Sequence, residues 1–214
     1  MGSPLLALQW SLEMAMCRLF MTLATCGLSA IHCMAGTVSA HVYDVVGKPL
    51  SDAVVFLESA AAKSASKPLV GIEVAQESKQ FVPSVSVVPI GSLVHFPNRD
   101  TVRHHVYSFS SAKKFELKLY TGTPANPVLF DRAGIVVLGC NIHDHMAAWV
   151  VVVETPYFGK TNAFGEINLG QVPAGRYRLR TWHSGFAVGS SAQEQPLSVT
   201  ESDVTAAVVK VVPP

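Results

Sequence analysis

Gly-Cys-Asn-Ile-His-Asp-His-Met, residues 139–146, is the stretch around which the rest of the chain is organised. It lies between two short apolar runs, so it is predicted to be a loop that joins two strands. The loop places a thiol, an imidazole and a thioether close together, at Cys140, His143 and Met146. Soft donors gathered on one short loop predict a metal site.

The donor set of this loop favours copper. Thiolate, imidazole and thioether are the ligands of a mononuclear electron-transfer site, in which two His and one Cys form a trigonal plane and a Met binds weakly along the axis. The sulfur ligands suit Cu(I), and imidazole suits both oxidation states. Such a site needs a second imidazole from a strand upstream of the loop. His104 and His105 are the candidates.

Length and composition limit the possible classes of protein. The 214 residues are 49% apolar and 14% charged, with a formal net charge of +1, which gives no indication of nucleic acid or an acidic surface as a partner. No apolar run reaches the roughly 18 residues that a membrane-spanning helix needs. The chain is long enough for one large or two small domains.

The first 35 residues are predicted to be an export signal, with Met14 or Met16 as alternative starts. Arg18 precedes an apolar run, residues 19–31, that is too short to span a membrane and suits the apolar region of a signal peptide. Cleavage is expected after Ala35, with Ala40 as the alternative. Lipid anchoring at Cys26 is not expected, because a threonine precedes it. The mature protein is therefore predicted to be periplasmic.

Removal of the signal leaves one of the 4 cysteines, Cys140. A single thiol cannot close an internal disulfide, and a leftover thiol in an exported protein is either reactive or a ligand. The alternative is a buried apolar cysteine. The neighbouring His143 and Met146 favour the ligand.

Short β-rich segments separated by Gly, Pro and Asp turns predict an all-β fold. Residues 59–67 (SAAAKSASK) have low complexity and predict a linker. Residues 176–182 alternate, with Tyr177 and Leu179 on one face and three arginines on the other. We expect that arginine face to be solvated; a docking stripe is the alternative. The expected strands are 37–44, 53–58, 71–76, 84–88, 92–96, 104–109, 115–119, 128–130, 135–138, 147–154, 176–182, 196–200 and 204–212.

Two spacings resemble the cupredoxins, the blue copper proteins. Asn98 lies six residues before His104, and the downstream loop has the short Cys-x2-His-x2-Met form of amicyanin. The resemblance covers about residues 70–154. It implies a Greek-key β-sandwich. It also implies that Asn98, without binding the metal itself, hydrogen-bonds across to the Cys140 loop and braces it. The implied copper ligands are His104, Cys140, His143 and Met146, with His105 as the alternative to His104.

The sequence departs from the family beside the second histidine, where a proline is usual and Ile142 and Asp144 stand instead. Asp144 and His145 are expected to lie exposed on the loop. His41, His95 and His183 have no partners in the sequence pattern and are expected to be structural or solvated.

The two flanks, 37–58 and 159–182, together resemble the small transthyretin-like or carboxypeptidase-regulatory-like β-sandwich. Each flank alone offers too few strands for a stable core. We therefore predict a signal at 1–35, a discontinuous sandwich from 36–62 and 155–214, and a cupredoxin domain at 68–154 inserted within it. The alternative is an N-terminal arm and a separate C-terminal hairpin domain.

A set of short motifs runs through the mature chain: Phe-Pro-Asn-x-Asp at 96–100, His-His-Val-Tyr-Ser-Phe-Ser at 104–110, Gly-Cys-Asn-Ile-His-Asp at 139–144, Thr-Pro-Tyr-Phe at 155–158 and Trp-His at 182–183. Together they resemble bacterial exported proteins described as methylamine-utilisation or plastocyanin-like, over nearly the whole mature chain. These resemblances imply a type 1 copper protein that carries single electrons between redox partners, such as a c-type cytochrome or an amine dehydrogenase, and is not an enzyme. The alternative is a copper delivery or sensing protein, against which stands the lack of a Met-rich or His-rich tract. A scaffold without metal is disfavoured because all four ligands are present.

Overall fold

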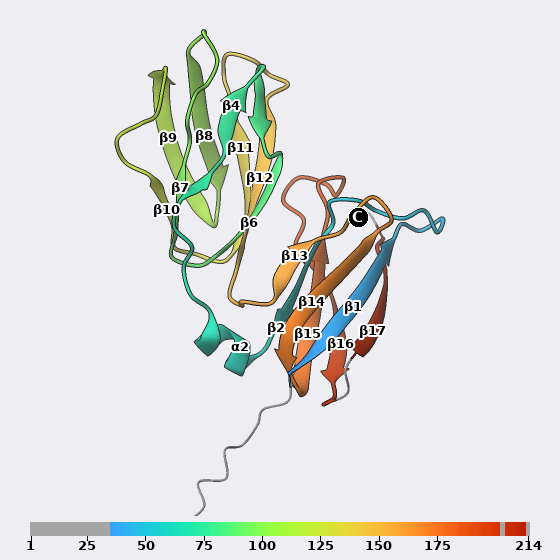
Figure 1. Cartoon of the computed structure of the whole chain (residues 1–214). Helices are drawn as coiled ribbons and strands as arrows, with labels where there is room; N and C mark the ends of the chain where they lie inside the picture. Colours follow the sequence, from blue (N-terminus) through green and yellow to red (C-terminus); the bar gives the residue numbers. More distant parts are fainter. Residues whose placement is uncertain (1–34, 202–203, 213–214) are drawn as a thin grey trace, which may run out of the picture. The chain divides into compact units, whose positions relative to one another are not determined.

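The computed structural model describes residues 35–201 and 204–212, and it is built almost wholly of strands (Figure 1). The prediction of an all-β chain is confirmed. The predicted signal lies outside the described residues except for its last one, Ala35. The strands are β1 (Ala35–Tyr43), β2 (Val54–Glu58), β3 (Ile72–Glu73), β4 (Ala75–Glu77), β5 (Gln80–Val82), β6 (Val85–Pro89), β7 (Ser92–His95), β8 (His104–Ser110), β9 (Lys113–Tyr120), β10 (Val128–Phe130), β11 (Gly134–Gly139), β12 (Ala147–Val153), β13 (Phe158–Lys160), β14 (Glu166–Pro173), β15 (Gly175–Trp182), β16 (Gln193–Val199) and β17 (Val204–Lys210).

The strands of the two flanks share two sheets. One has the order β14-β1-β17 and the other β13-β2-β15-β16. β1 alternates buried and half-exposed residues, and it pairs antiparallel with β14 and parallel with β17. Val38, Leu57 and Leu179 from these sheets belong to one hydrophobic core. The domain boundaries and the likeness to a transthyretin-like sandwich stay predictions.

The middle of the chain forms a five-stranded sheet, β6-β12-β11-β8-β9, a three-stranded sheet, β10-β7-β3, and the hairpin β4–β5. β12 pairs parallel with β6 and antiparallel with β11, so it lies inside its sheet. Its residues Val150 to Val153 are all buried, as expected for a strand covered on both faces. These strands enclose a second core, to which Cys140 and Met146 belong.

The segment predicted as a linker contains a short helix, α2 (Ala60–Ala65). The Ser59 hydroxyl accepts a hydrogen bond from the Ala62 amide at 3.1 Å and so caps its first turn. Three consecutive alanines then favour the helix, because alanine has the highest helix propensity. Within residues 35–201 and 204–212, no helix has the length and apolar character needed to cross a membrane.

The burial of β1 distinguishes between the two expected cleavage points, after Ala35 and after Ala40. Val38 and Ala40 on this strand are fully buried, and Ala40 pairs with Ile167 and Ala207 on either side. Cleavage after Ala40 would remove most of β1 and open that core. The strand therefore favours Ala35 over Ala40.

The arginines of β15 lie on one face, with Tyr177 and Leu179 buried on the other. Arg178 and Arg180 form ion pairs with Glu58, at 2.9 and 3.4 Å, and with Glu194. Their charges are thus partly balanced within the sheet, which favours a solvated strand face over a docking stripe.

Candidate metal centre

His104 opens β8 and is fully buried. Its Nε2 lies 2.8 Å from Oδ2 of Asp100, whose carboxylate also accepts the amides of Ser78 and Lys79 at 2.7 and 2.9 Å. Burial raises the pKa of Asp100, but the Lys79 amide, the His104 ring and the Ser78 amide together lower it below its usual 3.8. An ionised carboxylate only accepts hydrogen bonds, so Nε2 carries the proton and a neutral His104 keeps its lone pair on Nδ1.

The other candidate ligands lie on the connection between β11 and β12. Gly139 pairs with Ala147, so residues 140–146 form the loop of this hairpin. Cys140 is buried and its thiol is free, and His143 is half-buried. The Met146 amide donates to the His143 carbonyl at 2.9 Å, which closes a turn inside the loop and leaves the Met146 side chain buried.

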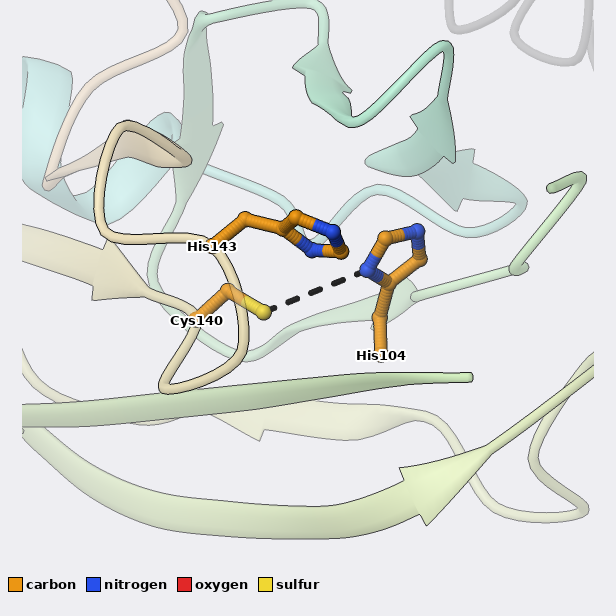
Figure 2. A group of neighbouring side chains, drawn as sticks. All are labelled: His104, Cys140 and His143. Carbon is orange, nitrogen blue, oxygen red and sulfur yellow. Dashed lines mark hydrogen bonds between the residues drawn. The ribbon is translucent and has the colours of Figure 1, made fainter. Parts of the chain in front are cut away.

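Three candidate ligands converge, one from the start of β8 and two from the connection between β11 and β12. One ligand atom from each of His104, Cys140 and His143 lies within 4.8 Å of the others. The Cys140 sulfur points toward the His104 ring, with 4.0 Å between Sγ and Nδ1, and the His143 ring faces His104 from the loop (Figure 2). The centroids of the two imidazoles are 5.1 Å apart.

The electrostatics of His143 favour a neutral ring. Desolvation is the largest cause that lowers its pKa from the usual 6.5, followed by the charges of His104 and Lys79. Its Nδ1 is buried and has no hydrogen-bond partner among the described residues. A buried nitrogen without a partner is costly, and a bound metal ion is one way to satisfy it.

His105 lies among different side chains from His104, at the point where the pairing of β8 with β9 shifts register. Its ring contacts that of Tyr107 at 5.7 Å between centroids, and its Nε2 lies 3.0 Å from Oε1 of Glu116. The structure therefore brings His104, not His105, next to Cys140. The roles of the candidate ligands, Met146 included, stay predictions.

Asn98 is buried, but its side chain does not bond to the Cys140 loop as expected. Nδ2 donates to the carbonyls of Val102 and Tyr120 at 2.9 and 2.8 Å, and Oδ1 accepts the Asp100 amide at 2.9 Å. The predicted partner is wrong, because both amide hydrogens of Asn98 bond to carbonyls outside the Cys140 loop. Asn98 instead fixes the loop that leads to His104.

Asp100 was not singled out by the sequence pattern, where it stands in a turn cluster. The spacing Asp-(x)3-His to His104 was the available signal. A carboxylate that accepts the outer N–H of a histidine is the usual arrangement behind a metal-binding imidazole. Gly139 was also missed: a Cβ there would lie 2.8 Å from the Tyr107 ring, so glycine permits this ring to pack against the backbone of residue 139.

The remaining polar residues lie largely as expected. Asp144 and His145 are exposed on the loop, although His145 also bonds to the Lys79 carbonyl at 3.1 Å. His41 stacks on Tyr43, and His183 accepts the Gly185 amide at Nδ1.

The chain matches no protein-family model and no curated protein. It is similar to several solved structures, which are cupredoxins or contain copper. A purple cupredoxin from Nitrosopumilus maritimus is 18% identical, covers 38% of this chain and 99% of its own, with a TM-score of 0.34. A reduced Cu(I) form of an amicyanin mutant is 21% identical over 46% of this chain and 98% of its own, with a TM-score of 0.35.

A copper-containing nitrite reductase from Thermus scotoductus SA-01 is 21% identical over 53% of this chain, with a TM-score of 0.37. This chain spans only 28% of that enzyme. Amicyanin belongs to the family that the sequence motifs resemble. Because these TM-scores lie below 0.5, these structures give no support to the function proposed below.

Proposed function

We propose that the protein is an exported type 1 copper protein that carries single electrons. His104, Cys140 and His143 would form the trigonal plane, and Met146 would be the axial ligand. The observation that carries the proposal is the convergence of two imidazoles and the one free thiol of the described residues, with ligand atoms within 4.8 Å of one another.

The distances fit a first-row metal ion. Bonds of about 2.0 Å to nitrogen and 2.3 Å to sulfur, at a trigonal angle, separate the two ligand atoms by roughly 3.7 Å. Sγ of Cys140 and Nδ1 of His104 are 4.0 Å apart. The chemistry fits as well, because Nδ1 of His104 faces the thiol while Nε2 is held by Asp100. Thiolate with two imidazoles is a donor set that copper accepts in both oxidation states.

Copper, when bound, supplies the one-electron chemistry, and the protein residues set its conditions. Asp100 fixes the His104 ring, so this ligand needs little movement when the charge of the site changes. The thiol of Cys140 is buried and thus kept from water and other thiols. The half-buried ring of His143 is the ligand nearest to solvent, and we propose its edge as the exit for electrons.

The proposal includes the cellular role. The carrier would work in the periplasm, exchange electrons with a c-type cytochrome or an amine dehydrogenase, and perform no catalysis of its own. The motifs shared with exported methylamine-utilisation proteins support this setting. The roles of the remaining histidines support a single copper site, since His105 faces Glu116 and Tyr107.

Titration of the purified mature protein with Cu(II) tests the proposal. We expect an intense visible thiolate-to-copper band at one equivalent, and no such band in Cys140→Ser. Cys140→Ser is a small change in volume, so its fold is checked by circular dichroism. Colourless copper binding by the wild type, or a band that survives in Cys140→Ser, would refute the carrier.

A second candidate is copper delivery or sensing, favoured by the partial exposure of His143. An exposed ligand gives an acceptor protein or chelator a place to begin exchange. The rates separate the two functions. A carrier should be reduced and reoxidised by a c-type cytochrome faster than it loses copper to a chelator, and a delivery protein should show the reverse order.

A further inference from the structure

The β4–β5 turn contacts both loops of the metal centre. Glu77 pairs with Gln80, so Ser78 and Lys79 form a two-residue connection. Both have a positive φ, 54° and 57°. Turns of this kind favour Asn-Gly, because other residues adopt this backbone at a cost. Ser-Lys here therefore needs compensation from outside the hairpin.

The compensation comes from the upstream loop. The amides of Ser78 and Lys79 both point to the Asp100 carboxylate, which in turn holds His104. β4 is bonded to the same loop, through the Gln76 amide to the Pro97 carbonyl at 2.8 Å and the Arg99 amide to the Gln76 carbonyl at 2.9 Å. The turn is thus fixed to the side of the site that carries His104.

The turn also contacts the downstream loop. The Lys79 carbonyl lies 3.1 Å from Nε2 of His145, and because a carbonyl only accepts, His145 is the donor. The same imidazole meets the His143 ring edge-on, with centroids 6.0 Å apart and planes at 65°. His145 therefore contacts the turn and a proposed ligand, although it is exposed and is not itself one of the proposed ligands.

We propose that His145 is a positioning residue that latches the 140–146 loop to the β4–β5 turn. Asp100 ties the turn to His104, and His145 ties it to Cys140 and His143, so the halves of the site stay at binding distance before copper arrives. A site held in its binding geometry binds more tightly, since less order is lost on binding. This inference rests on the proposed copper function.

Hydrogen exchange of the metal-free protein tests the latch without copper. The reporter is the Met146 amide, which is bonded to the His143 carbonyl inside the loop. His145→Ala should speed its exchange by about fivefold, the factor for one ordinary hydrogen bond. His145→Gln keeps an N–H donor and should restore slow exchange. Asp144→Ala, on an exposed neighbour in the same loop, should leave it unchanged.

Two results would overturn the latch. One is unchanged exchange in His145→Ala. The other is equal loss in His145→Ala and His145→Gln, because the hydrogen bond would then not be the cause.

Copper affinity gives a second readout, measured by competition with a chelator. His145→Ala should bind Cu(II) roughly tenfold more weakly, as is usual when a residue that orients a ligand is lost. His145→Gln should recover most of the affinity. A wild type without the thiolate band would refute the copper function, and the exchange result would still decide the latch. A normal band with equal affinity in wild type and His145→Ala would refute the latch alone.

Discussion

The two loops that meet at the candidate metal centre are held in different ways. In the upstream loop, residues 98–103, Asn98 and Asp100 are tied by hydrogen bonds of 2.7–2.9 Å, and the loop delivers a fully buried His104. The downstream loop, residues 140–146, has a turn bond from the Met146 amide and the contact of His145 with Lys79. It presents a half-exposed His143.

This difference assigns separate tasks to the two loops. The upstream loop is tied to the rest of the fold through the buried Asn98 and the Asp100 carboxylate, so its geometry does not depend on a bound metal. Most of the downstream loop faces solvent, so under the proposed function copper would enter there and a redox partner would reach the site there. Changes upstream should therefore cost global stability of the metal-free protein, whereas changes at exposed downstream positions that make no bond outside their loop should not.

The largest expected effect separates two neighbouring histidines of β8. His104→Ala should abolish the thiolate-to-copper band, because it removes the imidazole that faces Cys140. His105→Ala should keep the band, because that ring faces Glu116. Visible titration with Cu(II) measures both. A band retained in His104→Ala, or lost in His105→Ala, would exchange their roles.

Asn98→Ala should have the next largest effect, on stability. It removes three part-buried hydrogen bonds and leaves the carbonyls of Val102 and Tyr120 without this donor. At about 1 kcal/mol for each bond, the free energy of unfolding should fall by about 3 kcal/mol. Urea unfolding of the metal-free protein measures the change.

The matched control is Asn141→Ala in the exposed downstream loop. Its free energy of unfolding should stay within about 0.5 kcal/mol of the wild type, as is usual at the surface. Equal losses in the two variants would show that the loops do not differ in rigidity.

Local sequence was enough to find the downstream loop. Cys140, His143 and Met146 lie within one hairpin connection, and their spacing alone places them together. The upstream ligand was harder, because His104 and His105 both follow Asn98 at a plausible distance. Both rings are buried, and only the register of β8 decides which one faces Cys140; a shift of one residue would exchange them.

Interactions between distant segments could not be predicted in this way. Asp100 meets Ser78 and Lys79 across more than twenty positions of the chain, and no local pattern marks that pairing. The partner of Asn98 was wrong for the same reason, since carbonyl groups carry no sequence signature. The helix α2 was missed because its small residues suit both a linker and a helix.

Asp100→Asn should have a smaller effect, on copper affinity. The carboxylate accepts two amides and the His104 ring, whereas an asparagine must place its own NH₂ against one of these donors. Affinity for Cu(II) should fall about tenfold, measured by chelator competition. Asp144→Asn, which removes a charge from the exposed loop, is the control and should change it little. An equal fall in both variants would mean that charge alone, and not the orientation of His104, sets the affinity.

The smallest expected effect is on the protonation of His143. Because its folded pKa lies below the 6.5 of a free histidine, protonation disfavours the folded state. Its contribution to stability is therefore full above pH 6.5 and is lost as the pH falls through the folded pKa. Burial is the main cause and the charge of Lys79 a lesser one, so Lys79→Gln should raise this pKa slightly and weaken the acid loss. An NMR titration of the metal-free protein measures the ring directly, with Lys114→Gln on β9 as the charge-matched control. A wild-type His143 ring that titrates at or above pH 6.5 would mean that water reaches its Nδ1 freely. The downstream loop would then be too open to hold the ring in place before copper binds.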